Sequence, residues 1–215
     1  KRDQLGLILI DRYPIRDEEV NAIRAHHIKS EDGVYFIDAT RSPKSKDSQG
    51  VPGMAKNKGT KEGRTIYLPK GLAQQLQKLG AKNPTKKLFP NFAAKVTAAL
   101  KTIPGFEGVK TAAYKRQIVT FAGTDEVGLT PQERSAFNLM AGHAMDAGSL
   151  TEADKAIIKL YENRQDRKTL FEIQKRALEK IATAREKLEE GQLGKFEEAF
   201  IEGIKAPGLT IKDVS

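Results

Sequence analysis

The sequence of 215 residues contains no cysteine. This absence excludes a disulfide scaffold and thiolate metal sites, and it is compatible with a reducing compartment. Long apolar runs are also missing. The longest is Leu7–Ile10, so we expect no membrane-spanning segment. No signal-peptide pattern opens the sequence, and its first residue is lysine rather than methionine, so we expect a fragment or a processed product. A chain of this length buries roughly 70% of its unfolded surface and needs no covalent cross-links to fold.

Acidic residues are scarce in one part of the chain. Between Arg41 and Arg116 the sequence has 17 lysines and arginines against three acids, a balance of +14, whereas the remaining residues carry 20 basic and 25 acidic side chains. The chain as a whole has a net charge of +9. A basic segment of this kind suits a phosphate backbone, because each neutralised phosphate releases counterions. The alternative is a basic surface that only keeps the protein soluble.

Apolar periodicity predicts a mainly α-helical fold with a small antiparallel β-sheet. Residues Leu5–Ile10 are compatible with a buried helix or a buried strand. A helix is predicted over Asp17–Ile28, and strands are predicted at Gly33–Ile37 and Arg64–Leu68, the second stopped by Pro69. Residues 40–63 are rich in glycine and lysine and predict a long loop.

Later helices have clearer boundaries. Apolar spacing predicts helices over Leu72–Leu79, ended by Gly80, and over Phe92–Ile103. Thr130-Pro131-Gln132-Glu133 is a capping box with proline at the first helical position, and Thr151 can cap the next helix. A long charged helix with a narrow apolar stripe follows at Leu170–Leu188, and Phe196–Ile204 predicts a last short helix.

Five short segments are the informative motifs of this sequence. They are Tyr13-Pro14-Ile15-Arg16-Asp17-Glu18-Glu19 at the start of a helix; Asn57-Lys58-Gly59-Thr60-Lys61-Glu62-Gly63-Arg64 before a strand; Tyr114-Lys115-Arg116, followed by Thr120-Phe121-Ala122; Leu139-Met140-Ala141-Gly142-His143; and Ile157-Ile158-Lys159-Leu160-Tyr161. None of these segments is specific alone, but their order is informative.

In that order the five segments resemble the boxes of the tyrosine recombinase (phage integrase) family, and the resemblance covers residues 5 to about 163. It implies a catalytic domain at residues 1–163 that cuts one strand of duplex DNA by attack of the Tyr161 phenolate. The products would be a 3′-phosphotyrosyl bond and a free 5′-hydroxyl. Because the covalent intermediate keeps the bond energy, such an enzyme needs no nucleotide cofactor, and no metal ion is implied.

The resemblance also assigns roles to single residues. Arg16 and Arg116 would hold the non-bridging phosphate oxygens. His143 would bond the same phosphate or help to deprotonate Tyr161. Lys58, with Lys61 as the fallback, would protonate the leaving 5′-oxygen. Further DNA contacts are expected from basic residues in and around two segments: the loop of residues 40–63, and the Tyr114-Lys115-Arg116 segment, which we call the second-arginine box. These residues are Lys44, Lys46, Lys56, Lys61, Arg64, Lys110 and Lys115.

Two features depart from the family pattern. A histidine usually stands three positions before the second arginine, and here that position is Ala113. Tyr114, Lys115 or Lys110 could fill the space, or the role could be absent. In addition, 18 positions separate His143 from Tyr161, about twice the usual interval.

Other interpretations stay open. The chain could be a type IB topoisomerase, a hairpin telomere resolvase, or a catalytically degenerate nucleic-acid-binding protein that kept the fold. Locally, Arg16 could pair with Glu19, His143 could satisfy carbonyls at a helix end, and Tyr161 could be a core residue. The rival tyrosines are Tyr13, Tyr35, Tyr67 and Tyr114. His26 and His27 are adjacent and would point apart on a helix, so no metal site is predicted there.

Residues 164–206 are predicted to form a C-terminal helical extension, and residues 207–215 a tail. The apolar stripe of Ile173–Leu188 either folds back onto its own body or is exchanged with a neighbouring protomer. Members of the family commonly make such exchanges when four protomers assemble on two DNA duplexes. The resemblance implies the cytoplasm or nucleoid for a prokaryotic or phage protein and the nucleus for a eukaryotic or viral one.

Overall fold

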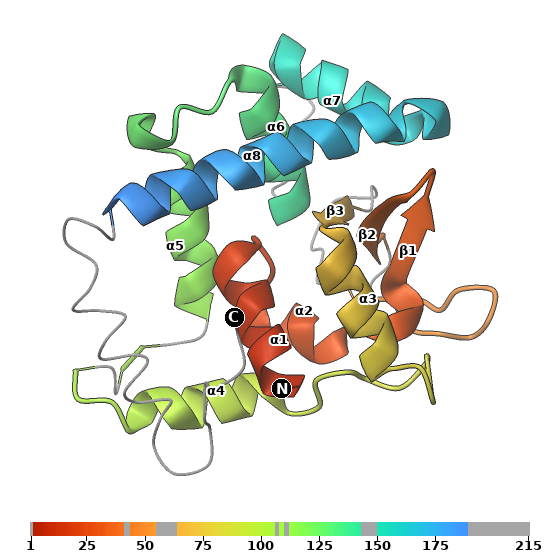
Figure 1. Cartoon of the computed structure of the whole chain (residues 1–215), viewed down its shortest axis with the longest axis vertical. Helices are drawn as coiled ribbons and strands as arrows, with labels where there is room; N and C mark the ends of the chain where they lie inside the picture. Colours follow the sequence, from red (N-terminus) through yellow and green to blue (C-terminus); the bar gives the residue numbers. More distant parts are fainter. Residues whose placement is uncertain are drawn as a thin grey trace.

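The computed structural model describes residues 2–40, 44–54, 64–105, 108–109, 112–142 and 150–188. Within these ranges it is mainly helical, with one three-stranded antiparallel sheet, which confirms the predicted fold class (Figure 1). Within the same ranges no helix is both long and apolar enough to cross a membrane. The elements are α1 (Arg2–Arg12), α2 (Asp17–Ala22), β1 (Ile28–Glu31), β2 (Val34–Ala39), β3 (Arg64–Leu68), α3 (Lys70–Leu79), α4 (Phe92–Lys101), α5 (Ala112–Ala122), α6 (Pro131–Ala141), α7 (Glu152–Glu162) and α8 (Arg167–Leu188).

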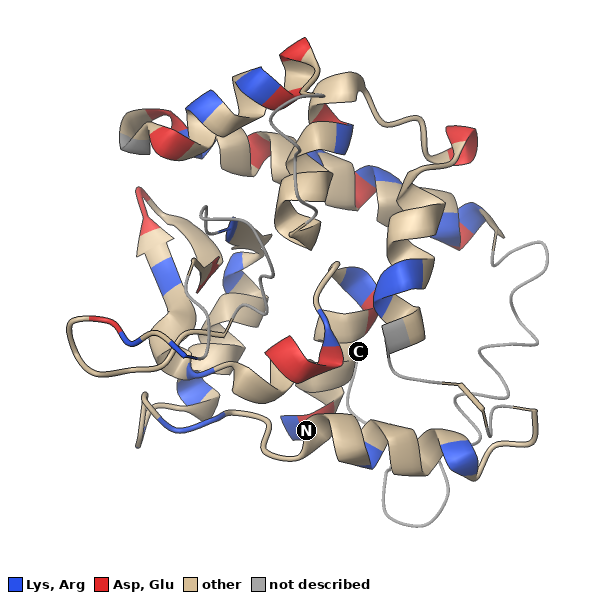
Figure 2. Ribbon diagram, turned by 180° about the vertical axis from the view of Figure 1, so that it is seen from behind, with Lys and Arg blue, Asp and Glu red and all other residues tan. Residues whose placement is uncertain are grey.

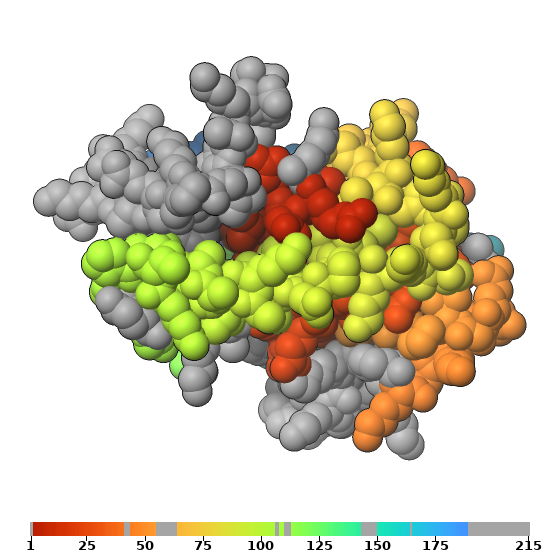
Figure 3. All heavy atoms as spheres, turned by 90° about the horizontal axis from the view of Figure 1, so that it is seen from below, coloured from red at the N-terminus to blue at the C-terminus, as the bar shows by residue number. Residues whose placement is uncertain are grey.

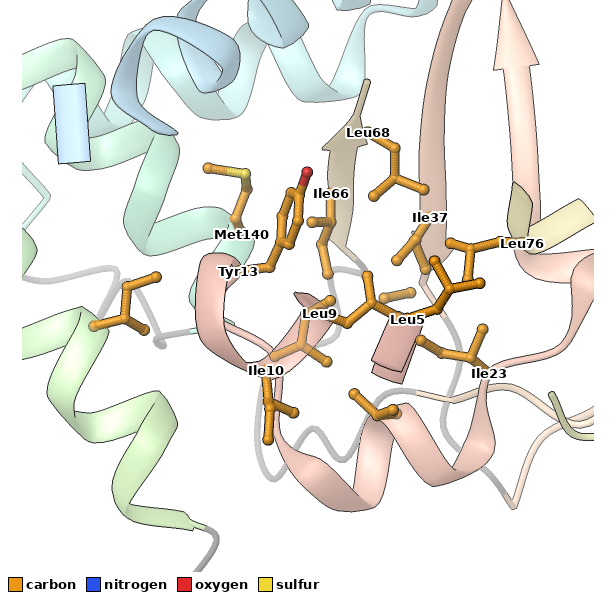
Figure 4. Packing of buried hydrophobic residues seen from close by; sticks show 14 of the residues in the cluster. Leu5, Leu9, Ile10, Tyr13, Ile23, Ile37, Ile66, Leu68, Leu76 and Met140 are labelled. Carbon is orange, nitrogen blue, oxygen red and sulfur yellow. The ribbon is translucent and has the colours of Figure 1, made fainter. Parts of the chain in front are cut away.

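Helix α1 lies at the centre of the fold. The apolar run within it was compatible with either helix or strand, and the structure makes it helical. Leu5 and Leu9, four positions apart and therefore on one face, are both buried in the main hydrophobic cluster. Figure 4 shows them among Ile37 and Ile66 of the sheet. The helix thus anchors the sheet side of the core.

The helix predicted over Asp17–Ile28 is wrong in its extent. Helix α2 ends at Ala22, a short 3₁₀ turn follows at Ala25–His27, and β1 begins at Ile28. A tertiary contact outweighs the helical spacing of apolar residues in this segment. The Ile23 carbonyl accepts a hydrogen bond from the Leu88 amide at 2.8 Å, and Arg24 forms an antiparallel bridge with Lys87. The backbone is therefore extended where the pattern predicted another helical turn.

The sheet has the order β1-β2-β3, with both pairs antiparallel. Ile37 of β2 lies opposite Ile28 of β1 and Ile66 of β3, and all three are buried. Helix α3 contacts β1 and β2, so it covers this part of the sheet. The two predicted strands are confirmed, and β1 is an additional strand.

Helix α8 packs against the rest of its own chain. This is one of the two alternatives predicted for the apolar stripe of Ile173–Leu188. Its Phe171 stacks on Phe36 of β2 with ring centroids 4.8 Å apart, and Lys180 pairs with Glu133 of α6 at 2.7 Å. Ala177, Ile181 and Ala184 belong to the main core cluster. In Figure 1, α8 crosses the fold beside α6 and α7. The predicted helix Phe196–Ile204 and the tail lie outside the described residues.

Side-chain caps fix two helix starts as predicted. The Thr130 hydroxyl accepts a hydrogen bond from the Glu133 amide at 3.2 Å, and the Glu133 carboxylate accepts one from the Thr130 amide at 2.9 Å. The same reciprocal pattern joins Thr151 and Asp154 at the start of α7. These local bonds satisfy amides that would otherwise lack partners at the first helical turn.

Gln174 links α8 to the outer side of β3, and this contact can be tested. Its side chain is fully buried, accepts from the Tyr67 amide at 3.0 Å and donates to the Thr65 carbonyl at 3.1 Å. We expect Gln174→Leu to lower the free energy of unfolding by about 1–3 kcal/mol, because two buried backbone groups lose their partners. Urea denaturation would measure this loss. The exposed Gln75 provides the control, and an equally small effect of Gln174→Leu and Gln75→Leu would contradict the prediction.

Candidate functional site

Four charged residues from distant parts of the sequence meet in the fold, and we call Arg16, Glu19, Arg64 and Lys115 the cation cluster. Its centre is a buried ion pair in which Arg64 Nη2 donates to Glu19 Oε2 at 2.5 Å. The same carboxylate oxygen accepts a bond from the Arg16 backbone amide at 2.9 Å. Burial alone would raise the pKa of Glu19, but Arg64, the Arg16 amide and Lys115 outweigh burial and hold the pKa below its ordinary value. Glu19 is therefore a carboxylate throughout the physiological range.

Lys115 reaches the cluster from α5. Its side chain is buried, and its ammonium group donates a hydrogen bond to the Ala141 carbonyl at the end of α6. Burial, followed by repulsion from Arg64 and Arg16, lowers the pKa of Lys115 to about 8, while Glu19 acts in the opposite direction. An ammonium group in this position is charged at neutral pH and loses its proton more readily than a lysine in water.

Helix α6 ends against Arg64. Gly142 caps the helix in the left-handed region at a φ of 63°. A Cβ placed on Gly142 would collide with the Arg64 guanidinium, whose Cζ would lie 3.2 Å away. Glycine is needed here for its backbone conformation and for the missing side chain. The end of α6 therefore lies directly beside the cation cluster.

Two of the three cations, Arg64 and Lys115, are buried beside one buried carboxylate, whereas the Arg16 side chain is exposed. Arg64 is only 2% exposed, and its Nε atom is buried without a hydrogen-bond partner among the described residues. Burying charge and donors in this way is costly unless an opposite charge or an acceptor compensates. Glu19 supplies the opposite charge for Arg64, and the Ala141 carbonyl supplies the acceptor for Lys115.

The structure distributes the predicted site residues unevenly. Arg16 is exposed at the start of α2, and Arg116 is exposed on α5. Arg64 and Lys115, predicted as DNA contacts, are both buried in the cluster, whereas Lys44 and Lys46 are exposed on the loop before β3. The predicted residues Lys56, Lys58, Lys61, Lys110 and His143 lie outside the described residues.

Tyr161 lies in a second hydrophobic cluster. It is half-buried on α7 and packs against the group formed by Ala136, Leu139, Ile157, Leu170 and Ile173. The Arg167 guanidinium lies 5.7 Å from the centre of the tyrosine ring, and Arg167 Nη1 is 3.4 Å from Glu31 Oε1 on β1. Arg167, at the start of α8, thus links the Tyr161 ring on α7 to Glu31 of the sheet.

The rival tyrosines differ in how easily they could ionise. Burial raises the pKa of Tyr114 to about 12, with Asp11 adding to the effect. The pKa of Tyr13 is raised further, first by burial, and that of Tyr67 is raised chiefly for the same reason. A phenol whose anion is destabilised is a poor nucleophile, so these three are weaker candidates for attack.

A small polar pocket of about 90 Å³ lies between the start of the sheet and the loop before β3. His26 and His27 both line it, contrary to the divergence expected for neighbours on an α-helix, because they lie in a 3₁₀ turn. His26 Nε2 is 2.5 Å from Asp47 Oδ2, and His27 Nε2 is 3.1 Å from the Pro52 carbonyl. Burial lowers the pKa of His27 to about 4, so this imidazole is neutral at physiological pH. Within the described ranges no three metal-ligating side chains are grouped to hold an ion.

Sequence reasoning missed the role of Glu19 as the partner of Arg64, 45 positions away. The only signal was the Arg16-x-x-Glu19 spacing itself.

No family model, curated protein or solved structure matches the chain.

The buried state of Lys115 predicts an unusual pH dependence of stability. Its pKa is about 8 in the fold and about 10.4 in an unfolded chain, so the unfolded state binds more protons between these values. The free energy of unfolding should therefore rise with pH from about 8 to 9.5, by on the order of 1–2 kcal/mol. Urea denaturation of the wild type and of Lys115→Met would check this. The rise should vanish in the variant and persist in the exposed control Lys155→Met; a rise that survives in Lys115→Met would contradict it.

Proposed function

We propose that this chain is the catalytic part of a DNA breaking and rejoining enzyme, a site-specific recombinase, integrase or transposase that acts through a 3′-phosphotyrosyl intermediate. One observation carries the proposal: segments of four of the five sequence boxes converge on the cation cluster. Arg16 and Glu19 come from the first box, and Arg64 is the last residue of the second, the Asn57–Arg64 segment. Lys115 belongs to the second-arginine box, and its bond partner Ala141 is two positions before His143.

The proposed chemistry uses the positive charge of the cation cluster. A phosphodiester of duplex DNA sits beside the cation cluster, where Arg16 and Lys115 stabilise the charge that develops on its non-bridging oxygens. The Tyr161 hydroxyl attacks phosphorus and loses its proton, with His143 as the acceptor. The bond from phosphorus to the 5′-oxygen breaks, and Lys58 supplies the proton that completes the 5′-hydroxyl. Reversal with a different 5′-hydroxyl joins new strands without any energy source.

Ala177, Ile181 and Ala184 of α8 are part of this chain's own core. An exchange of α8 would therefore require the partner's α8 to take the same place in the core. We propose that residues beyond Leu188 join protomers in the expected ring of four.

A second function is favoured by one observation at α5. The side chain that enters the cluster is Lys115, while Arg116 and Ala113 are exposed. A lysine offers one point charge where a guanidinium would offer a planar fork to two oxygens. A chain that kept the DNA-binding surface but lost strand cleavage would show this replacement. The second proposal is therefore a non-catalytic DNA-binding protein of the same fold.

Covalent trapping separates the two functions. A duplex with a nick near the cleavage site loses its short 5′-hydroxyl fragment after attack, so the protein–DNA adduct accumulates. Because the site is unknown, a pool of nicked random duplexes serves as substrate. We expect a denaturation-resistant adduct with the wild type and none with Tyr161→Phe, while Tyr35→Phe behaves like the wild type. No adduct from the wild type, with duplex binding intact, would support the binding protein instead.

The two neighbours on α5 can be told apart by the same adduct assay. If Lys115 serves the phosphate, Lys115→Gln should slow adduct formation by about 100-fold or more, as expected for the loss of a donor to a developing oxyanion. Arg116→Gln should slow it by less than about tenfold, because neighbouring residues on a helix point in different directions and Lys115 is the one that enters the cluster. Lys115→Arg is the control for charge, and thermal melting confirms that each variant folds. The opposite ranking would return the role to Arg116.

A further inference from the structure

Two surface loops are held against the same short segment, on a side of the molecule formed by different elements from those of the cation cluster. One loop is residues 44–54, before β3, and the other is residues 80–90, between α3 and α4. We call them the paired loops. Arg24 joins them: its Nε donates to the Thr85 carbonyl at 2.9 Å and its Nη1 to the Pro52 carbonyl at 3.4 Å. In Figure 3 the orange and yellow segments that contain these loops lie next to each other.

Further bonds fix each loop in place. The His26 amide donates to the Pro84 carbonyl at 3.0 Å, and the Leu88 amide donates to the Ile23 carbonyl at 2.8 Å. On the other loop, Asp47 pairs with His26 and accepts bonds from the amides of Gln49 and Val51, both at 2.9 Å. The backbone of both loops is thus set before any partner arrives, which lowers the entropy cost of binding.

The charged side chains on the paired loops are nearly all basic. Five exposed lysines project from them, namely Lys44, Lys46, Lys82, Lys86 and Lys87. Asp47 is the single acidic residue among the described residues of these loops, and its carboxylate already bonds His26 and two backbone amides. No acid occurs anywhere between residues 70 and 105, whereas this stretch has seven lysines. Figure 2 shows its lysines along α4 and the loop before it.

Arg24 itself is not part of the charged surface. Its guanidinium donates to the carbonyls of Ala22, Thr85 and Pro52, so it organises the loops, and the exposed lysines form the surface that a partner would meet. Flexible point charges on a rigid base suit a partner with evenly spaced negative charge and no required register. The phosphate backbone of duplex DNA has this character.

We propose that the paired loops bind the phosphate backbone of duplex DNA away from the cleaved phosphate, as a second, sequence-independent contact. This inference rests on the proposed function and adds the surface by which the duplex is held. Binding at two separate places restrains the duplex while its scissile phosphate occupies the cation cluster. The contact carries no base readout, because lysines on phosphates fix position but not sequence.

The triple variant Lys82→Gln, Lys86→Gln, Lys87→Gln tests the proposal. Fluorescence anisotropy with a duplex of about 30 base pairs, from about 50 to 200 mM potassium chloride, gives affinity and its salt dependence. We expect at least a tenfold loss of affinity at the lowest salt, and a plot of log K against log salt that is less steep by roughly 2–3, since each phosphate contact contributes about 0.9. The matched control is Lys155→Gln, Lys168→Gln, Lys187→Gln, with the same charge change on α7 and α8.

Each outcome supports or overturns a specific part of the proposal. Equal losses in the two triple variants would overturn it, because net charge rather than the paired loops would then govern binding. Equal affinity of the wild type for heparin, double-stranded RNA and duplex DNA would overturn the assignment to DNA. Failure of the proposed function is recognised separately. If the wild type forms no adduct on nicked duplexes but the loop variant loses affinity, the DNA contact of the paired loops is supported and the strand-cleaving activity is rejected. If the wild type forms the adduct and the loop variant keeps its full affinity, the enzyme stands and the paired loops are not its second DNA contact.

Discussion

The buried ion pair of Arg64 and Glu19 is the contact on which the site depends. It joins the first residue of β3 to the middle of α2, and it brings the guanidinium against Gly142 at the end of α6. Lys115 then ties α5 to the same helix end through Ala141. Loss of one partner from such a pair costs about 3–5 kcal/mol, because the other charge is left buried without compensation. The pair therefore fixes where four elements meet.

Elements with strong local signals could be predicted from the sequence. The capping boxes at Thr130 and Thr151 fix two helix starts through bonds within one turn, and the apolar stripe of α8 is long enough to define its helix. The helix predicted through Ile28 was wrong in its second half, because apolar spacing cannot report that the amide of Leu88, 65 positions after Ile23, bonds the Ile23 carbonyl. Long-range hydrogen bonds of this kind override helical spacing, and they are invisible until the fold is known.

The candidate site could be predicted only as a set of segments. Box order pointed to Arg16 and to the Lys115–Arg116 pair, but neighbours on a helix face different directions, and the sequence does not say which faces the interior. Lys115 is buried and Arg116 exposed because the Ala141 carbonyl and Glu19 lie on the side of Lys115. In the same way, Arg24 looks like one more cation in the sequence, yet it joins two loops by donating to their carbonyls.

Gln174 also determines how the sheet can meet other molecules. A terminal strand with free amides and carbonyls is a template for strands of neighbouring chains, which is a common route to aggregation. At β3 the Tyr67 amide and the Thr65 carbonyl are already taken by one glutamine side chain, which imitates a residue of a missing fourth strand. Edge-to-edge pairing between copies is thus blocked on this side. Such pairing could occur only at the other edge of the sheet, on β1. That strand has four residues, and the charges of Lys29 and Glu31 discourage pairing with another chain.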